Sequence, residues 1–428
     1  MSSSVANLDM KKPRVLGLQK IAKRAVLSQL KKLHTGKMII KDGDDILEFG
    51  SNQTSLLVGQ LEILDNSAYV DILTGGSIGA AEAYMTGDWI TPDLTGLIKI
   101  MVRNMDVLDA MEGGIVNLIS KPFLKWFHYL NQNSAKGSRR NIAAHYDLGN
   151  DLFEQFLDPT MMYSSGIFAT ADSTMEQASN YKLKTICEAL KITATDRVVE
   201  IGTGWGGFAL YAAKNYGCHV TTTTISEEQF KWTQQAVMRE GLEDKVTLLK
   251  QDYRLLIDRN ENKFDKLVSI EMIEAVGAKY FDTYFETVSK LLKPNGLALI
   301  QSITIEDQRF EGALKNVDFI QRYIFPGSCI PSIQSILTAT KKSTDLNLVN
   351  LNDFGQDYSR TLNAWQKQFD INEDAITALG YSEDFKRMWR FYLSYCEGGF
   401  SERAIGVSHI LLAKPQCKYE KLKHNIIY

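Results

Sequence analysis

The sequence has 428 residues, of which 44% are hydrophobic and 23% charged, a composition typical of a folded protein with a sizeable core. This length exceeds one ordinary domain and predicts a small domain together with a larger one. The net charge of -3 argues against nucleic-acid binding by the protein as a whole. Its five cysteines are scattered without a CxxC pair, which indicates reduced thiols in the cytoplasm.

The N-terminal segment, residues 1–36, is basic and amphipathic. Nine lysines and arginines and no acidic residue occur from Lys11 to Lys37, and residues 14–33 carry apolar side chains near helical spacing. This pattern fits a helix docked on its own domain, and it equally fits an interfacial helix bound to anionic headgroups. No apolar h-region opens the sequence, and no apolar run approaches the roughly eighteen residues of a spanning helix. We therefore expect a cytoplasmic protein that meets the inner face of the membrane peripherally.

Residues 37–120 predict a small α+β domain, to which we assign lipid docking. Turn residues separate several strand-like segments, and a Gly-rich turn leading into a short helix, GGSIGAAEAYMTGDW, follows them. The strand-like segments are GKMIIKDGDDILEFG, TSLLVGQLEIL and AYVDILTG. Residues 121–140 end in the polar and basic stretch NQNSAKGSRR and predict a linker.

Residues 141–415 alternate between strand-like and helix-like segments. Such alternation predicts βαβ units and a parallel sheet covered by helices on both faces. The expected fold class is α/β, a doubly wound Rossmann-like sheet beside the smaller α+β domain, with residues 416–428 as a tail. The strand-like segments are RVVEIG, HVTTTTI, KVTLLKQ, FDKLVSI, GLALIQSI, LNLVNL and IGVSHILLA, and the helix-like ones are FALYAAKNYG, EEQFKWTQQAVMREG and KYFDTYFETVSKLLK.

The strongest local signal is the turn VVEIGTGWGG at residues 198–207, where a strand ends and a helix begins. Glycines let the backbone take positive φ and approach a ligand closely, and ligands of such sheets bind at the carboxyl ends of the strands. Gly202, Gly204 and Gly207 satisfy GxGxxG, the spacing of a dinucleotide site. That interpretation also requires an acid closing the second strand, where the chain instead has threonines up to Thr224. A nicotinamide oxidoreductase is the first rival hypothesis.

With Glu200 just ahead of the glycines, the turn has the pattern E-x-G-x-G-x-G, which resembles motif I of class I S-adenosylmethionine-dependent methyltransferases. Further segments resemble, in order, the cyclopropane-fatty-acyl-phospholipid synthase family, which includes the mycolic acid cyclopropane synthases. They are GGSIGAAEAYMTGDW, HYDLGNDLFEQFLDPTMMYSSGIF, LVSIEMIEAVG, FIQRYIFPGSCIPS, DYSRTLNAW and FYLSYCEGGF. The resemblance runs from about residue 75 to residue 415. It implies a class I methyltransferase that uses S-adenosylmethionine to close double bonds of phospholipid acyl chains into cyclopropane rings.

This reaction makes defined demands on a site. An alkene has no lone pair, so methyl transfer from a sulfonium donor leaves a carbocation on the acyl chain. The site must exclude water, aromatic faces can stabilise the cation, and a base must remove a proton from the new methyl group. The resemblance implies that bound bicarbonate is this base. The residues it assigns to the bicarbonate site are Glu274, Tyr358, Ser165, Gln301, Ile303 and Cys396.

The sequence departs from the family pattern near this site. Ser165 stands where cysteine is frequent, Gln301 where a histidine ligand is expected, and Glu271 where many members have glycine. Glutamine forms hydrogen bonds but does not titrate. These changes leave open a variant chemistry, such as methyl-branch formation. They also sustain a second rival hypothesis, a non-catalytic lipid-binding protein that kept the scaffold.

For the methyl donor, the resemblance implies contacts from the segment before motif I, from the turn, and from the ends of the second and third strands. The residues are Tyr163, Ser164, Glu200, Gly202, Thr203, Gly204, Thr224, Gln229 and Asp252. No metal site is expected, because His145 has no second histidine or acid cluster at ligand spacing. The expected partner is an anionic phospholipid surface, and the resemblance makes a homodimer a further expectation.

Several of these residues also have a purely structural interpretation. Glu274 could cap the helix that begins near Gly277, Tyr358 could be a core tyrosine with a bonded hydroxyl, and Cys396 could be a small buried residue. Without the resemblance, the structural interpretation is favoured for all three. With it, function is favoured for Glu274 and Tyr358, and Cys396 stays open.

Overall fold

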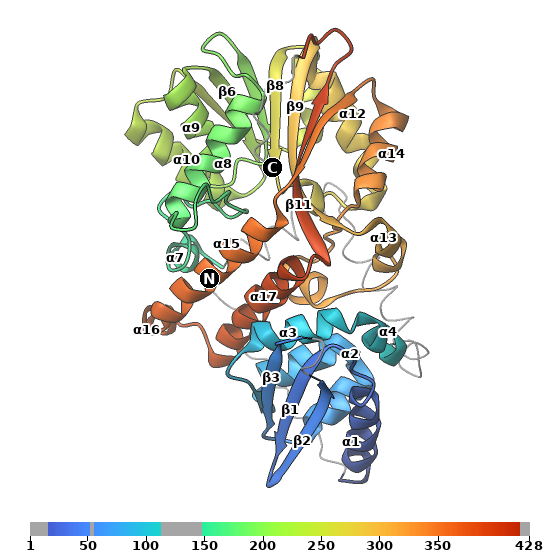
Figure 1. Ribbon diagram of the computed structural model, residues 1–428. Coiled ribbons are helices and arrows are strands. Elements are labelled where there is room, and N and C mark those ends of the chain that lie inside the picture. The colour runs from blue at the N-terminus through green and yellow to red at the C-terminus, as the bar shows by residue number, and fades with distance from the viewer. Residues whose placement is uncertain (1–15, 52–54, 113–147, 420–428) are drawn as a thin grey trace. The chain divides into compact units, whose positions relative to one another are not determined.

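The computed structural model describes residues 16–51, 55–112 and 148–419, which fall into two compact units (Figure 1). The predicted linker and His145 lie outside these described residues. The first unit contains the described residues up to 112 together with 315–326 and 358–405, and the second contains 148–314, 327–357 and 406–419. The first unit therefore includes two segments that the chain order had placed in the methyltransferase domain.

The first unit combines a small sheet with helices, as an α+β domain requires. Its strands follow the order β2-β1-β3-β4, with β1 antiparallel to β2 and parallel to β3. Its elements are α1 (Leu16–Leu30), β1 (Gly36–Asp42), β2 (Asp45–Ser51), β3 (Val58–Ile63), α2 (Ser67–Met85), β4 (Trp89–Ile90), α3 (Leu94–Arg103), α4 (Met105–Glu112), η4 (Ile320–Ile324), α15 (Gly355–Ile371, beginning in the second unit), α16 (Glu373–Ala378) and α17 (Glu383–Ser401).

One predicted strand, AYVDILTG, is wrong, because these residues form the first half of α2. Its β-branched and aromatic side chains favour strands only weakly, and packing decides the outcome. Tyr69 is 1% exposed, and its hydroxyl donates to Asp42 Oδ2 on β1 at 2.7 Å. Gly76, at φ 56°, kinks the helix where the sequence predicted a turn.

Helix α1 confirms the basic amphipathic helix in the described part of the N-terminal segment. Ala22, Val26 and Leu30 are buried, and the helix packs against α2. Docking on its own domain is therefore confirmed for this face. Leu18 and Ile21 remain 45% and 63% exposed, so a second face is directed to solvent.

Helix α17 joins the first unit through close packing and charge pairing. A Cβ on Gly398 would lie 2.5 Å from Ile98 Cγ2, so α17 approaches α3 closely only because this residue is glycine. Arg103 Nε and Nη2 donate to the two Glu402 carboxylate oxygens at 2.6 and 3.2 Å. These contacts span about three hundred residues of sequence, so no local pattern in the sequence could predict them.

The second unit is a seven-stranded sheet of order β10-β11-β9-β8-β5-β6-β7. The pairs formed by β5 with β6 and β8, by β6 with β7 and by β8 with β9 are parallel, and β10 runs antiparallel to β11. Its elements are α7 (Asn150–Glu154), α8 (Met175–Ala189), β5 (Arg197–Ile201), α9 (Gly207–Tyr216), β6 (His219–Thr224), α10 (Glu227–Glu240), β7 (Val246–Lys250), η1 (Tyr253–Leu255), α11 (Ile257–Asn260), β8 (Phe264–Ile270), η2 (Ile273–Ala275), η3 (Ala278–Tyr280), α12 (Phe281–Leu291), β9 (Leu292–Ile305), α13 (Asp307–Ala313), α14 (Ile333–Ser343), β10 (Asn347–Asp353) and β11 (Ile405–Ala413).

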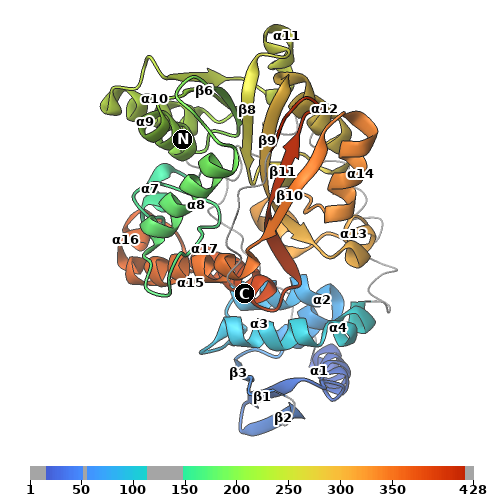
Figure 2. The same cartoon turned by 45° about the horizontal axis from the view of Figure 1, so that its top comes forward.

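Helices cover both faces of this sheet, as predicted. Helices α8, α9 and α10 lie on one side and α12 and α14 on the other (Figures 1 and 2). Neighbouring residues of one strand point to opposite faces, so Val198 packs with the first group and Val199 with the second. The predicted doubly wound α/β fold is confirmed, and every strand predicted for this unit is present.

The strand order places the functional edge of the sheet. The chain winds outward from β5 to β7 and then returns to β8 on the other side of β5. Ligands of doubly wound sheets bind at the carboxyl ends of the strands beside such a switch point. The turn after β5 and the segment after β8 are therefore the expected site. In the described part of the chain, no helix has the length and apolar character needed to cross a membrane.

Candidate active site

The glycine turn after β5 has the backbone that the motif predicts. Gly202, Gly204 and Gly206 have φ of 96°, 54° and 92°, in the region that favours glycine. A Cβ on Gly202 would lie 3.1 Å from Met272 Cγ, so the segment after β8 packs directly on the turn. Nothing lies within 4 Å of a Cβ built on Gly204, which leaves its backbone open to a ligand. The turn therefore fits the methyl donor.

Glu200, on the strand β5 that leads into this turn, stabilises it through buried hydrogen bonds. Its carboxylate is 2% exposed and accepts a hydrogen bond from Thr222 Oγ1 at 2.6 Å, and Thr222 lies 2.7 Å from the Thr203 hydroxyl. Burial raises the pKa of Glu200 to about 8, against smaller lowering effects of Thr222 and the Lys182 charge. The structure thus links Glu200 and Thr203 through a threonine of β6, and their contacts with the donor stay predictions.

A buried lysine on α8 contacts Ser164, in the segment before motif I, and the sequence did not predict this contact. Lys182 of α8 is fully buried and donates to Ser164 Oγ at 2.6 Å. Burial lowers the pKa of Lys182 to about 8, although Glu271 and other nearby carboxylates raise it. Tyr163 packs in an aromatic cluster, with ring centroids 5.1 Å from Phe153 and 6.4 Å from Trp205.

The remaining donor residues are held by their neighbours. Thr224 Oγ1 donates to Gln229 Oε1 at 2.9 Å, and both side chains are buried at the end of β6. Asp252, after β7, accepts hydrogen bonds from Arg254 Nε at 2.8 Å and Nη2 at 2.5 Å. These residues lie at carboxyl ends of neighbouring strands, and their donor contacts stay predictions.

Glu274 lies in the turn η2 after β8, and it does not cap the helix near Gly277. Its Oε1 accepts hydrogen bonds from Ser302 Oγ at 3.1 Å and from the Ile303 backbone N–H at 2.5 Å. Its Oε2 is buried and has no hydrogen-bond partner within the described residues. Burial and the nearby Glu271 charge raise the pKa of Glu274 to about 8.

Glu271 is the centre of a second hydrogen-bonded group. Its Oε1 accepts from the Ser165 backbone N–H at 2.9 Å and from Gln301 Nε2 at 2.7 Å. Gln301 Oε1 pairs with His409 Nε2 at 3.0 Å, which fits the tautomer protonated on Nε2. Burial lowers the pKa of His409 to about 3, so this imidazole is neutral. Glu271 has φ 47°, a backbone conformation that favours glycine.

These bonds bear on the predicted bicarbonate site. The donors expected from this unit are the Ser165 N–H, the Gln301 side chain and the Ile303 N–H. The first two bind Glu271 and the third binds Glu274, while the Ser165 hydroxyl donates to the Gly166 carbonyl at 2.9 Å. The chain's own carboxylates thus take the contacts that bicarbonate would need, and this donor set does not fit a bound bicarbonate.

Tyr358 and Cys396 belong to the first unit, on α15 and α17. The Tyr358 ring is buried and stacks on Phe400 with centroids 4.3 Å apart. Burial and the charge of Asp318 raise the pKa of the Cys396 thiol, so it is neutral and poorly nucleophilic. Their predicted roles beside Glu274 stay predictions.

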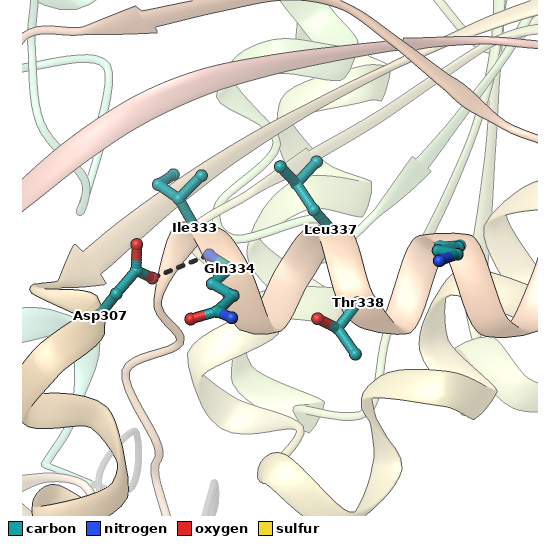
Figure 3. A pocket seen from close by; sticks show the side chains of 6 residues that line it. Asp307, Ile333, Gln334, Leu337 and Thr338 are labelled. Atoms are coloured by element: carbon teal, nitrogen blue, oxygen red, sulfur yellow. Dashed lines mark hydrogen bonds between the residues drawn. The ribbon is translucent and has the colours of Figure 1, made fainter.

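A surface hollow of about 390 Å³ lies elsewhere in the second unit, between α13 and α14 (Figure 3). Asp307 of α13 accepts a hydrogen bond from the Gln334 backbone N–H in the first turn of α14 at 2.9 Å. The other lining residues are Ile333, Leu337, Thr338 and Lys341. None of these lining residues is a buried titratable group, so the hollow lacks the chemistry found after β8.

Comparison with known proteins decides the family. The sequence profile of mycolic acid cyclopropane synthetase matches residues 133–410. The chain belongs to this family. It is 38% identical to cyclopropane-fatty-acyl-phospholipid synthase of Escherichia coli over 80% of this chain and 85% of that protein. It is 35% identical to tuberculostearic acid methyltransferase UfaA1 of Mycobacterium tuberculosis over 76% of each chain.

Solved structures of cyclopropane synthases have the same fold as the second unit's family match. The cyclopropane synthase MmaA2 from Mycobacterium tuberculosis and the mycolic acid cyclopropane synthase CmaA1 complexed with SAH and CTAB each superpose with a TM-score of 0.59 at 27% identity. Each match covers 64% of this chain and 98% of the solved one. The protein is therefore an S-adenosylmethionine-dependent methyltransferase of this family with a class I fold.

Proposed function

We propose that this protein transfers a methylene from S-adenosylmethionine to the cis double bond of unsaturated phospholipid acyl chains and closes a cyclopropane ring. The observation that carries the proposal is the pair Glu271 and Glu274, held after β8 against the donor turn. Ring closure needs a proton acceptor beside the methyl donor, and a carboxylate pair can supply one. The Escherichia coli relative, named as a cyclopropane-fatty-acyl-phospholipid synthase, supports the same substrate class.

The chain's residues divide the work between two strand ends. The turn from Gly202 to Gly204 holds the donor, which supplies an electrophilic methyl group when bound. Glu274 is held by hydrogen bonds from Ser302 and Ile303 of β9, which fix the position of its carboxyl group. A buried site also keeps water from trapping the carbocation.

A second product is consistent with the same site. The relative named tuberculostearic acid methyltransferase UfaA1 is 35% identical, and methyl branching passes through the same carbocation. The two outcomes differ in which carbon loses the proton. A base close to the new methyl group favours the ring, whereas a base close to the neighbouring chain carbon favours a branched alkene.

The test uses the purified full chain, isotopically labelled S-adenosylmethionine and vesicles of anionic phospholipid with cis-monounsaturated chains. Mass spectrometry then follows the acyl chains. A gain of one CH2 with loss of the double bond is the expected result. The same gain with a retained alkene would replace the ring by a methyl branch, and no gain with any unsaturated lipid would overturn the proposal.

We further propose that the exposed face of α1 binds the anionic lipid surface. Lys20 and Arg24 are exposed on this helix, together with Leu18 and Ile21, and exposed Lys31 directly follows its last residue. Basic side chains near anionic headgroups contribute about 1 kcal/mol each, and exposed apolar side chains can enter the headgroup boundary.

Co-sedimentation with vesicles tests this surface. Reversing the charges of Lys20, Arg24 and Lys31 to glutamate should weaken binding to anionic vesicles at least tenfold. The matched control reverses three exposed lysines outside α1, namely Lys279, Lys341 and Lys367. Equal loss in both triple variants would mean that net charge, and not α1, determines binding.

A further inference from the structure

The Glu271 carboxylate makes the contacts that the family resemblance assigns to bicarbonate. Its Oε1 binds the Ser165 backbone N–H at 2.9 Å and the Gln301 amide at 2.7 Å. Both partners are N–H donors, which stabilise a negatively charged oxygen. His409 fixes Gln301 from behind at 3.0 Å, so the amide presents its NH2 group to Glu271.

We propose that Glu271 is the base of ring closure and that this protein works without bicarbonate. The proposal rests on the cyclopropanation proposed above and names the group that completes it. It follows from the donors on Ser165 and Gln301, which the side chain of Glu271 already occupies.

The two glutamates are suited to different tasks. Glu274 is buried beside the charge of Glu271, which favours its protonated form and raises its pKa to about 8. Glu271 faces N–H donors and the nearby Lys182 ammonium, whose own pKa the Glu271 charge raises. One environment favours the protonated carboxyl group and the other favours the carboxylate. Under this proposal Glu274 keeps its proton and Glu271 accepts one.

Glu271 also lies beside the donor turn. Its neighbour Met272 is the residue that a Cβ on Gly202 would approach to 3.1 Å. Its partner Ser165 directly follows Ser164, one of the residues expected to contact the donor. A base at this point lies at the same end of the sheet as the turn that we propose holds the methyl donor.

Ring closure makes two carbon–carbon bonds and breaks one carbon–sulfur and one carbon–hydrogen bond. The π electrons of the double bond form a bond to the methyl carbon, and the carbon–sulfur bond breaks with its electron pair going to sulfur. Glu271 takes one proton from that methyl group, and the electrons of the broken C–H bond close the ring onto the cationic carbon. Glu271 ends protonated and releases the proton to solvent before the next turnover.

Glu271→Gly is the informative variant. Glycine adopts positive φ without strain, so the variant should fold, and it leaves the Ser165 and Gln301 donors to an added anion. In bicarbonate-free buffer we expect the wild type to be fully active and Glu271→Gly to lose at least about 100-fold, the usual contribution of a general base. Added bicarbonate should restore Glu271→Gly at least tenfold and leave the wild type unchanged.

Glu271→Gln tests whether the activity depends on the size of the side chain or on its basic carboxylate. It fills the same space without a basic oxygen, so it should stay inactive with or without bicarbonate, while exposed Glu311→Gln keeps full activity. Binding of 13C-labelled bicarbonate, measured by NMR, should appear in Glu271→Gly and be absent in the wild type. Wild-type binding of bicarbonate, or full activity of Glu271→Gly without it, would overturn the inference while leaving cyclopropanation intact. Absence of any product from the wild type would overturn cyclopropanation, and the NMR measurement would still decide the occupancy.

Discussion

The donor turn and the carboxylate pair lie at the ends of neighbouring strands, β5 and β8, but the sequence encodes them differently. The turn is contiguous, from Glu200 to Gly207, and its glycine conformations follow from local sterics. The carboxylate pair depends on partners far along the chain: Ser165 and Glu271 are 106 residues apart, and Gln301 and His409 are 108 apart. A local motif can be found in one sequence, whereas the second group appears only once the sheet places its strands side by side.

The two regions also differ in their charge balance. Burial raises the pKa of Glu200 and of Glu274 to about 8 in each case. Glu200 is compensated by the Thr222 hydroxyl and the Lys182 charge, which suits a structural support. Glu274 instead faces the like charge of Glu271 and has one unpartnered buried oxygen within the described residues. Such imbalance is a property of reactive sites.

The largest expected effect comes from Glu274→Gln. The amide keeps the size and the neutral charge of the protonated side chain but cannot release or take up a proton, so product formation should fall at least about 100-fold. Donor binding should stay within about twofold, because the turn after β5 is untouched. Isothermal titration with S-adenosylmethionine and the acyl-chain assay measure the two effects separately.

The control for this variant is Glu311→Gln on α13, where the side chain is exposed. It should leave both product formation and donor binding unchanged. Full activity of Glu274→Gln would remove this residue from the mechanism, and a parallel loss of donor binding would make it a support of the turn.

A smaller effect is expected on folding. Because Glu274 has a pKa of about 8 in the folded protein and an ordinary value of 4.5, the folded state retains a proton between these values that the unfolded state has released. The free energy of unfolding therefore falls as pH rises from about 5 to about 8, by up to about 1.4 kcal/mol per pH unit. Glu274→Gln lacks this titration, so it should gain stability relative to the wild type as pH rises.

Urea unfolding followed by circular dichroism at several pH values within this window measures the difference. Glu200 titrates in the same direction but is present in both proteins, so its contribution cancels in the comparison. If the free energy of unfolding depends on pH in the same way in both proteins, Glu274 is already ionised in the folded state. Neither carboxyl group of the pair would then be protonated at neutral pH.

The sequence predicted most of the second unit, because short β-branched and apolar runs and glycine turns are local signals. All seven strands of its sheet were expected from such runs. The segment AYVDILTG failed because Tyr69 is held by Asp42, a contact outside any local window. The assignment of residues 358–405 by chain order differed for the same reason, since the Arg103–Glu402 pair joins distant segments.

The site shows the same division. Glu200, Gly202 and Glu274 were named from motifs, whereas Lys182 and His409 were missed because no motif contains them. A fully buried lysine on an amphipathic helix has no sequence signature, although its position facing Ser164 becomes evident once α8 is placed. Glu271 was noticed only as a departure from glycine, and its φ of 47° lies in the region that glycine adopts without strain.

The smallest expected effect tests the donor turn itself. In Gly202→Ala the alanine must adopt a φ of 96°, and its Cβ lies 3.1 Å from Met272 Cγ. Backbone strain of about 1–2 kcal/mol should displace the turn and weaken S-adenosylmethionine binding about tenfold, while the folded fraction is retained. Gly312→Ala on α13, where a Cβ meets nothing within 4 Å, is the matched control and should leave the dissociation constant unchanged. If donor affinity survives Gly202→Ala but ring formation falls, the change has been transmitted through Met272 to Glu271. A shift of the turn would then move the carboxylate pair as well, although one region is encoded locally and the other by residues far apart in the sequence.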